Sequence, residues 1–355
     1  MVRQGLGPHW NCVFANDFDA KKTAAYQTNW GGGEIVLEDI HKLTTTDLPP
    51  GQAHLAWASF PCQDLSLAGR RAGLQGGKSG AFWGFHNLMS GLAAEGREPT
   101  VLALENVPGL LSAHGGADFS ALCDAVAGLG YHLGAVMVDA KDFVPQSRQR
   151  LILIAAKNPD VALVSPQPIS WCSPPTLTDA TEGLSAAAKA KWVWWRLPEP
   201  TGVVRPFSAL VEDFPSSVSW HDPNETQALL SMMNKTHLSK VAAAKNSGKR
   251  QVGTIYKRTR TENGAKVQRA EVRFDNIAGC LRTPGGGSSR QTIMVVDGHL
   301  ARSRLISTRE TARLMGLPDS YILPENYNEA YHLTGDGVVA PVVRYLAEHI
   351  FEKIR

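Results

Sequence analysis

The sequence contains no apolar run of about 18 residues, the length that a helix needs to span a bilayer. Its first residues include no continuous apolar segment of the secretory kind, and the chain shows no internal repeat or long low-complexity tract. These absences argue against membrane, secreted and repeat proteins and predict a cytoplasmic location. With 355 residues, 43% of them hydrophobic, the chain can form one large domain and a smaller one.

Cysteine is also scarce. The five cysteines are odd in number, far apart and never in a CxxC spacing. This pattern predicts free thiols and indicates neither a disulfide framework nor a metal site.

The chain has no strong overall charge, because its net charge is only +3. Between Lys235 and Arg290, however, thirteen Lys and Arg stand against three acids, a local excess of +10 that leaves −7 for the remainder. Such a block can be a solvated face or the electrostatic footprint of a nucleic-acid binder.

The most informative stretch is 59–66 (SFPCQDLS), which follows an apolar segment, 53–58, that is typical of a buried strand. Cys62 is therefore expected at the carboxyl end of a strand, where open α/β sheets keep their chemistry. Nearby Arg70, Arg71 and Lys78 can lower the pKa of a thiol and make it nucleophilic. The alternative is a small buried hydrophobe.

Acidic residues follow other predicted strands. Glu105 ends the apolar run 100–104, so it shares a rim with Cys62 if the two strands are parallel; a cap or an ion pair is the alternative. Asp17 ends a short strand, where its carboxylate could bind the hydroxyls of a ribose while the neighbouring Phe18 stacks on an adenine. The alternative there is a helix N-cap by Asp17 or Asp19.

Further predicted elements continue the α/β alternation of a doubly wound sheet: helices over 81–96 and 117–129 and strands over 133–138 and 151–155. From about residue 159, many prolines and scattered tryptophans predict a second, smaller domain with little regular structure, in which the tryptophans form a local core. Ser307 to Glu310 is a capping box for a helix that stops at Gly316, and the last helix carries Pro341 in its first turn.

Three motifs in order, PCQ (61–63), ENV (105–107) and QSRQR (146–150), resemble those of the cytosine-C5 DNA methyltransferase family of bacterial and phage type. The likeness continues in 304–318 and in GDGVVAPVV (335–343). It implies a Rossmann-like S-adenosylmethionine-dependent methyltransferase sheet with an inserted target-recognition domain. The implied boundaries are 1–158 for the catalytic and cofactor-binding domain, 159–292 for target recognition, and 293–355 for the return to the catalytic domain.

The resemblance also implies the chemistry. Cys62 adds to C6 of a flipped cytosine, C5 receives the methyl group of S-adenosylmethionine, and Glu105 donates a proton or hydrogen bond at N3. Arg150 and Arg148 match the arginines that hold the O2 atom of the base. The implied cofactor-binding residues are Asp17, Phe18, Asp39, Ile40, Pro61, Asp336 and Val338. The implied DNA-binding residues are Gln63, Ser66, Arg70, Arg282 and Thr283.

The implied partner is double-stranded DNA, with a cognate restriction endonuclease as a second one, and the protein is expected to be a monomer. The family begins with a strand and a Gly-rich FxGxG loop, whereas this sequence begins MVRQGLG. Either the start of the sequence is placed too late or the protein lacks a central strand and binds the cofactor poorly, and this chain alone is expected to be less stable and weakly active. Three other functions stay open: a tRNA cytosine-C5 methyltransferase, a catalytically silent DNA-binding homologue and, more distantly, a cysteine hydrolase.

Overall fold

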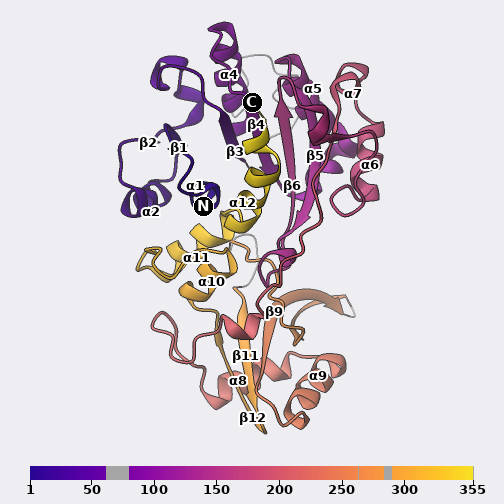
Figure 1. Ribbon diagram of the computed structural model, residues 1–355. Helices are drawn as coiled ribbons and strands as arrows, with labels where there is room; N and C mark the ends of the chain where they lie inside the picture. Colours follow the sequence, from indigo (N-terminus) through magenta and orange to yellow (C-terminus); the bar gives the residue numbers. More distant parts are fainter. Residues whose placement is uncertain (61–79, 263, 284–289, 355) are drawn as a thin grey trace. The chain divides into compact units, whose positions relative to one another are not determined.

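The computed structural model describes residues 1–60, 80–262, 264–283 and 290–354 (Figure 1). No helix in these ranges is long and apolar enough to cross a membrane. The chain divides into two compact units. The first, called here the sheet-α unit, comprises 2–139, 149–200 and 342–355; the second, the ribbon unit, comprises Met1, 140–148 and 201–341.

The sheet-α unit is built on a four-stranded sheet whose strand order is β3-β4-β6-β5. The strands are β3 (Leu55–Ser59), β4 (Val101–Asn106), β5 (His132–Asp139) and β6 (Gln149–Ala156). β3 and β4 are parallel, as the sequence predicts, with Ser59 beside Glu105. β6 is antiparallel to both β4 and β5, so the predicted α/β alternation is wrong for this last pair, which is an antiparallel hairpin.

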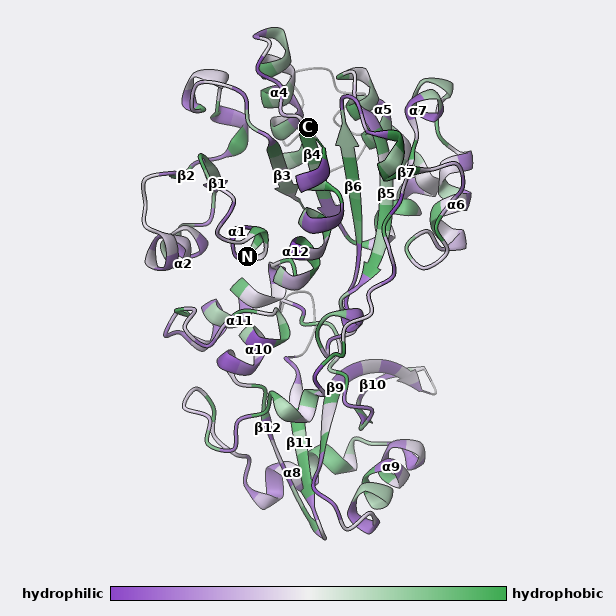
Figure 2. Cartoon of the chain, viewed as in Figure 1, coloured by the Kyte–Doolittle hydropathy of each residue, from purple (hydrophilic) through white to green (hydrophobic). Residues whose placement is uncertain are grey.

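The core of this unit follows from near-continuous apolar strands, which are expected when both faces of a sheet are covered. All six residues of β4 are buried, and Figure 2 shows hydrophobic residues concentrated along β4, β5 and β6. Alternate strand residues pack with two helices, α4 (Ala81–Ala94) and α5 (Ala117–Gly128). From α4 the cluster takes Phe82, Phe85, Leu88, Met89 and Leu92.

Two smaller sheets belong to the same unit. β1 (Ala15–Asp17) and β2 (Ile35–Leu37) are parallel and are joined by α2 (Ala20–Trp30). β7 (Val164–Ser165) pairs with β8 (Trp194–Trp195). Trp195 is buried, and Trp192 and Trp194 pack on the main cluster, so the prediction of a separate local core is wrong for these tryptophans, which belong to the core of the sheet-α unit. The remaining helices are α1 (Val2–Leu6), α6 (Pro175–Glu182) and α7 (Ala186–Lys191).

The C-terminal helix α12 (Ala340–His349) carries Pro341 in its first turn, as predicted. Its later residues Val343 and Leu346 are fully buried. Phe351, just beyond it, accepts a hydrogen bond from His54 Nε2 at 2.8 Å, and its ring lies 6.3 Å from that of Trp57. This segment therefore completes the core beside β3.

The ribbon unit contains a four-stranded antiparallel sheet with the order β10-β9-β11-β12. The strands are β9 (Gln251–Glu262), β10 (Ala265–Arg273), β11 (Thr292–Asp297) and β12 (Leu300–Leu305). The helices are α8 (Pro223–Ser231), α9 (Lys235–Asn246), α10 (Thr308–Leu314) and α11 (Tyr327–Asp336). The expectation of little regular structure after residue 159 is thus wrong for 223–305, because α8, α9 and the sheet bury a shared apolar cluster.

The predicted capping box is present. Ser307 accepts a hydrogen bond from the Glu310 N–H at 3.1 Å, and the Glu310 carboxylate accepts one from the Ser307 N–H at 2.7 Å. α10 gives way to Gly316, whose φ is +72° and where an added Cβ would lie 2.2 Å from Pro341 Cδ. Only glycine combines this backbone conformation with so close a neighbour.

Candidate active site

A carboxylate and a guanidinium meet at one end of the main sheet. Glu105, near the end of β4, is 6% exposed, and its Oε1 lies 2.7 Å from Arg150 Nε. The meeting follows from strand direction: β6 runs antiparallel to β4, so Arg150, near the start of β6, reaches the rim where β4 ends. The two residues that the sequence places in separate motifs therefore form a nearly buried ion pair.

The same rim is tied to the end of β3. Asn106, 5% exposed, donates from Nδ2 to the carbonyl of Phe60 at 2.9 Å and accepts from the Val107 N–H at 2.8 Å. Phe60 is itself buried against Phe82. The chain is thus fixed beside Glu105 two residues before Cys62. Asn106 was not among the predicted site residues, although its place next to Glu105 within ENV is a signal that could have identified it.

Arg148 lies in the ribbon unit and is 2% exposed. Its guanidinium donates to three carbonyls, those of Leu281 (2.8 Å), Gly335 (2.9 Å) and Gly337 (2.7 Å). Gln146 is fully buried and joins the same network, because its Oε1 accepts from the Leu281 N–H at 3.0 Å. Arg148 therefore organises main chain in this unit.

The segment that Arg148 holds contains four predicted binding residues. Thr283 donates to the Asp336 carboxylate at the end of α11, and Arg282 is exposed. Val338, just after α11, is buried. Arg282, Thr283, Asp336 and Val338 are thus neighbours in the ribbon unit, joined through Arg148 and the Thr283 hydroxyl.

Four predicted cofactor residues lie at one edge of the β1-β2 sheet. Because β1 and β2 are parallel, Asp17 and Phe18 follow the carboxyl end of one strand while Asp39 and Ile40 follow that of the other. Asp19 caps α2 by accepting from the Lys21 and Lys22 N–H groups. The cap is therefore Asp19, and Asp17 is the other acid at this edge.

This edge fits the nucleoside part of S-adenosylmethionine. The Phe18 ring is 81% exposed, an unusual position for an aromatic side chain, and it is the residue next to Asp17. A ring left open to solvent can stack on an adenine, and a carboxylate can accept hydrogen bonds from both ribose hydroxyls. Ile40 packs against the main apolar cluster and anchors the second loop.

Two of the described cysteines, Cys123 and Cys172, lack what a nucleophile requires. Cys12, Cys123, Cys172 and Cys280 are free thiols. Burial raises the pKa of Cys123 well above its usual value, with the neighbouring Asp124 adding to the effect, and burial raises that of Cys172 to about 11. Neither thiol ionises at neutral pH, so neither can act as a thiolate.

Five predicted site residues lie outside the described residues: Pro61, Cys62, Gln63, Ser66 and Arg70. The position nearest to Cys62 that the structure describes on the N-terminal side is Phe60. The proposed role of Cys62 therefore depends on sequence and on the geometry of Phe60, Glu105 and Arg150.

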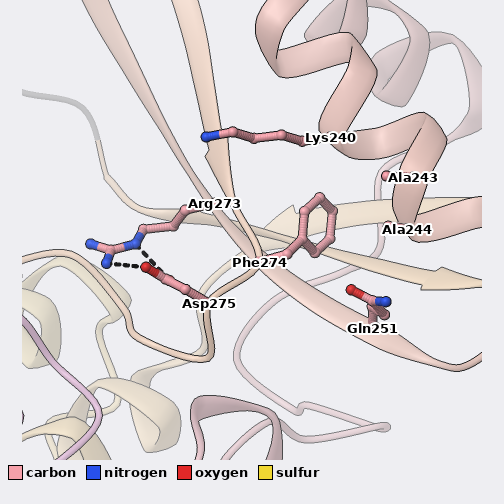
Figure 3. Close-up of a pocket in the computed structure, with 7 residues that line it drawn as sticks. All are labelled: Lys240, Ala243, Ala244, Gln251, Arg273, Phe274 and Asp275. Atoms are coloured by element: carbon pink, nitrogen blue, oxygen red, sulfur yellow. Dashed lines mark hydrogen bonds and ion pairs between the residues drawn. The ribbon is translucent and has the colours of Figure 1, made fainter. Parts of the chain in front are cut away.

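A shallow hollow of about 360 Å³ lies elsewhere, between α9 and the ends of β9 and β10 (Figure 3). It is lined by Lys240, Ala243, Ala244, Gln251, Arg273, Phe274 and Asp275. Arg273 is held by Asp275, with Nε 2.7 Å from Oδ1. None of the predicted site residues lines this hollow, and we assign no chemistry to it.

Comparison with known proteins identifies the family of this chain and several distant relatives. The model of the C-5 cytosine-specific DNA methylase family matches residues 3–352. Type II methyltransferase M.MspI of Moraxella sp is 27% identical over 340 residues, which are 96% of this chain and 65% of that protein. Type II methyltransferase M.Bsp6I of a Bacillus sp. is 25% identical over 355 residues, covering 98% of this chain and 93% of that protein.

Among solved structures, that of S. pombe Dnmt2 methyltransferase is similar at a TM-score of 0.53 and 18% identity. The similarity covers 96% of this chain and 91% of that one. At this identity the likeness shows the fold alone, and it confirms the α/β methyltransferase fold predicted from the sequence.

Proposed function

Since the chain belongs to the C-5 cytosine-specific DNA methylase family, whose methyl donor is S-adenosylmethionine, we propose that it methylates cytosine at C5 within a specific sequence of duplex DNA. The observation that supports this most is the Glu105–Arg150 pair, together with the Asn106 hydrogen bond to the Phe60 carbonyl. These contacts bring a carboxyl group beside the strand end that leads into Pro61-Cys62-Gln63. A nucleophile and an acid on one rim are the minimum that addition to a pyrimidine ring requires.

In the proposed reaction the Cys62 thiolate forms a bond to C6 of the cytosine. The electron pair of the C5–C6 double bond is then displaced through the ring toward N3, where Glu105 donates a proton; this step requires the protonated form of Glu105 when the cytosine is bound. S-adenosylmethionine would supply the methyl group that C5 receives. Loss of the C5 proton to a base, expulsion of the Cys62 thiolate and return of the N3 proton to the Glu105 carboxylate restore the neutral ring. Because a stacked base exposes neither C6 nor N3 fully, the cytosine must first flip out of the duplex.

Arg150 has two tasks in this scheme. Its Nε–Oε1 contact orients the Glu105 carboxyl group, and it stabilises the carboxylate that remains after proton donation. Its Nη1 donates to the Gln149 carbonyl at 2.8 Å, and its Nη2 can bind O2 of the base. Arg148 is better suited to positioning, since its guanidinium is occupied by three main-chain carbonyls.

We assign the cofactor edge to Asp17, Phe18, Asp39 and Ile40, with Pro61, Asp336 and Val338 as further cofactor residues. DNA contacts are assigned to Gln63, Ser66, Arg70, Arg282 and Thr283, and target recognition to residues 159–292. A cognate restriction endonuclease and a monomeric state remain part of the proposal.

The test is methyl transfer from tritiated S-adenosylmethionine to plasmid DNA, compared for the wild type, Cys62→Ala and Glu105→Gln. Wild type should label DNA, Cys62→Ala should abolish labelling, and Glu105→Gln should lower it by about 10² or more. Duplex DNA containing 5-fluorocytosine should trap a covalent adduct with the wild type but not with Cys62→Ala, because fluorine at C5 cannot leave as a proton does.

Other outcomes would overturn the proposal. Methyl transfer by the Cys62→Ala variant would contradict the proposed thiolate mechanism. Preferential labelling of a tRNA transcript would assign the protein to tRNA, and DNA binding without any methyl transfer would identify a silent homologue.

A further inference from the structure

The longest pair of strands in the ribbon unit extends well beyond its own sheet. β11 pairs with β9 only over Gln251–Ile255, whereas β10 pairs with β9 as far as Glu262. Among the described strands, the outer half of β9 therefore has β10 as its one partner. Figure 1 shows the two strands continuing past the other strands of this sheet, and Figure 2 shows hydrophilic residues along β10 there. We call residues 257–269 the ribbon tip.

The ribbon tip is not explained by stability. Most of its residues are exposed, and an isolated two-stranded ribbon is marginally stable in water. It carries five Lys and Arg but one acid, Glu262. A cationic ribbon that buries little of itself is suited to a polyanion.

The register separates the two faces of the tip, since directly paired residues point to the same side. On one face, Arg258 lies opposite Arg269. These arginines are neutralised by glutamates on the same face: Arg258 Nε lies 3.2 Å from Glu271 Oε2, and Arg269 Nε donates to Glu262 Oε1 at 2.7 Å. Arg260 also pairs with Glu271. The arginines on this face are therefore already occupied by ion pairs.

The other face is different. Thr259 lies opposite Gln268, and Thr261 lies opposite Lys266. All four side chains are exposed, and within the described part of the chain none of them makes a hydrogen bond or an ion pair. The threonine hydroxyls and the glutamine amide are groups that can bind base edges, and the lysine ammonium is a group that can contact a phosphate. We call these four residues the open face.

We propose that the ribbon tip enters the major groove of the target duplex with its open face toward the bases, so that Thr259, Thr261 and Gln268 help to select the methylated sequence and Lys266 contacts phosphate. This inference rests on the proposed function, because the duplex that the ribbon tip would bind is the DNA that the active site methylates. The major groove of B-form DNA is wide enough for a two-stranded ribbon, whereas that of A-form RNA is too narrow and deep. Duplex DNA is therefore favoured over RNA.

The experiment compares three ribbon-tip variants with the wild type. The open-face variant is Thr259→Ala/Thr261→Ala/Gln268→Ala, and the charge variant is Lys266→Ala. The matched control is Glu262→Gln/Arg269→Gln, which alters the opposite face without changing net charge. Melting curves establish that each variant is folded. Fluorescence anisotropy then measures binding to a short duplex carrying the sequence that bisulfite sequencing finds methylated, and to a random-sequence duplex, over about 50 to 200 mM salt.

The open-face variant should bind the methylated sequence about tenfold more weakly, with binding to the random duplex changed by less than about twofold. Lys266→Ala should make the dependence of the binding constant on salt less steep: the negative slope of log K against log salt should shrink in size by about 1 on both duplexes. The control should match the wild type.

The proposal is overturned if the open-face variant keeps wild-type affinity and site choice, if the control loses as much, or if a tRNA transcript suffers the larger loss. If the wild type methylates no DNA, the proposed function fails separately. In that case the salt slope of Lys266→Ala on the random duplex still decides whether the tip contacts nucleic acid.

Discussion

The fully buried Arg304–Glu310 ion pair in the ribbon unit provides the sharpest stability test. Both side chains are inaccessible to solvent, with Arg304 Nη1 2.8 Å from Glu310 Oε2 and Nη2 also bonded at 2.6 Å. The carboxylate accepts two further bonds, from the Ser307 and Glu212 N–H groups, each at 2.7 Å. Glu310→Gln keeps the shape but offers one acceptor oxygen, leaving Arg304 charged and facing an amide. Removing one member of a buried pair costs about 3–5 kcal/mol, which is the loss that we expect in the free energy of unfolding.

The assay is urea unfolding followed by tryptophan fluorescence, with circular dichroism as a second probe. Glu348→Gln is the matched control, because the Glu348 carboxylate is 53% exposed and pairs with Arg344 at 2.9 Å within one helix. An exposed pair of this kind contributes about 0.3–0.5 kcal/mol. A double variant, Arg304→Met/Glu310→Leu, should not recover the loss, because it leaves the buried Ser307 N–H and the partly buried Glu212 N–H without their acceptor. Equal effects of Glu310→Gln and Glu348→Gln would refute the argument from burial.

Two further predictions concern the site. Asn106→Ala leaves the Phe60 carbonyl without its hydrogen-bond donor. This variant should lower kcat for methyl transfer by about tenfold to a hundredfold, with little change in KM for DNA. An unchanged kcat would show that this contact does not position the strand end. Phe18→Ala should raise KM for S-adenosylmethionine about tenfold, as loss of one stacking ring costs about 1–3 kcal/mol. Val161→Ala, at another exposed apolar residue, serves as control, and the assignment is lost if both variants leave KM unchanged.

Features encoded locally were predictable from the sequence. The Ser307–Glu310 capping box, the stop at Gly316 and Pro341 in the first turn of α12 each depend on a few neighbouring residues, and all are present. The parallel β3–β4 pair was also predictable, because a long helical segment separates the two strands. Strand direction and side-chain partners set by distant segments were not. The antiparallel direction of β6 is one case.

Arg148 and the ribbon tip illustrate this limit. The carbonyls that surround the Arg148 guanidinium belong to residues more than a hundred positions away, at Leu281, Gly335 and Gly337. The sequence around position 148 therefore does not predict that the Arg148 side chain is buried. The strands of the ribbon tip lack the alternating apolar residues by which strands are recognised, because the outer half packs on no core. There the sequence displayed only a cluster of positive charge.

The division of the chain has a consequence for biosynthesis. Residues 342–355 belong to the sheet-α unit, yet the ribosome makes them only after the whole of 201–341. Until they emerge, the nascent β3 lacks the Phe351 carbonyl and ring that meet His54 and Trp57, and the apolar surface that later receives Leu346 and Ile350 stays uncovered. The sheet-α unit therefore cannot complete its folding until residues 342–355 are synthesised. Interruption of translation shortly before residue 342 would release a chain prone to aggregation or to binding by chaperones.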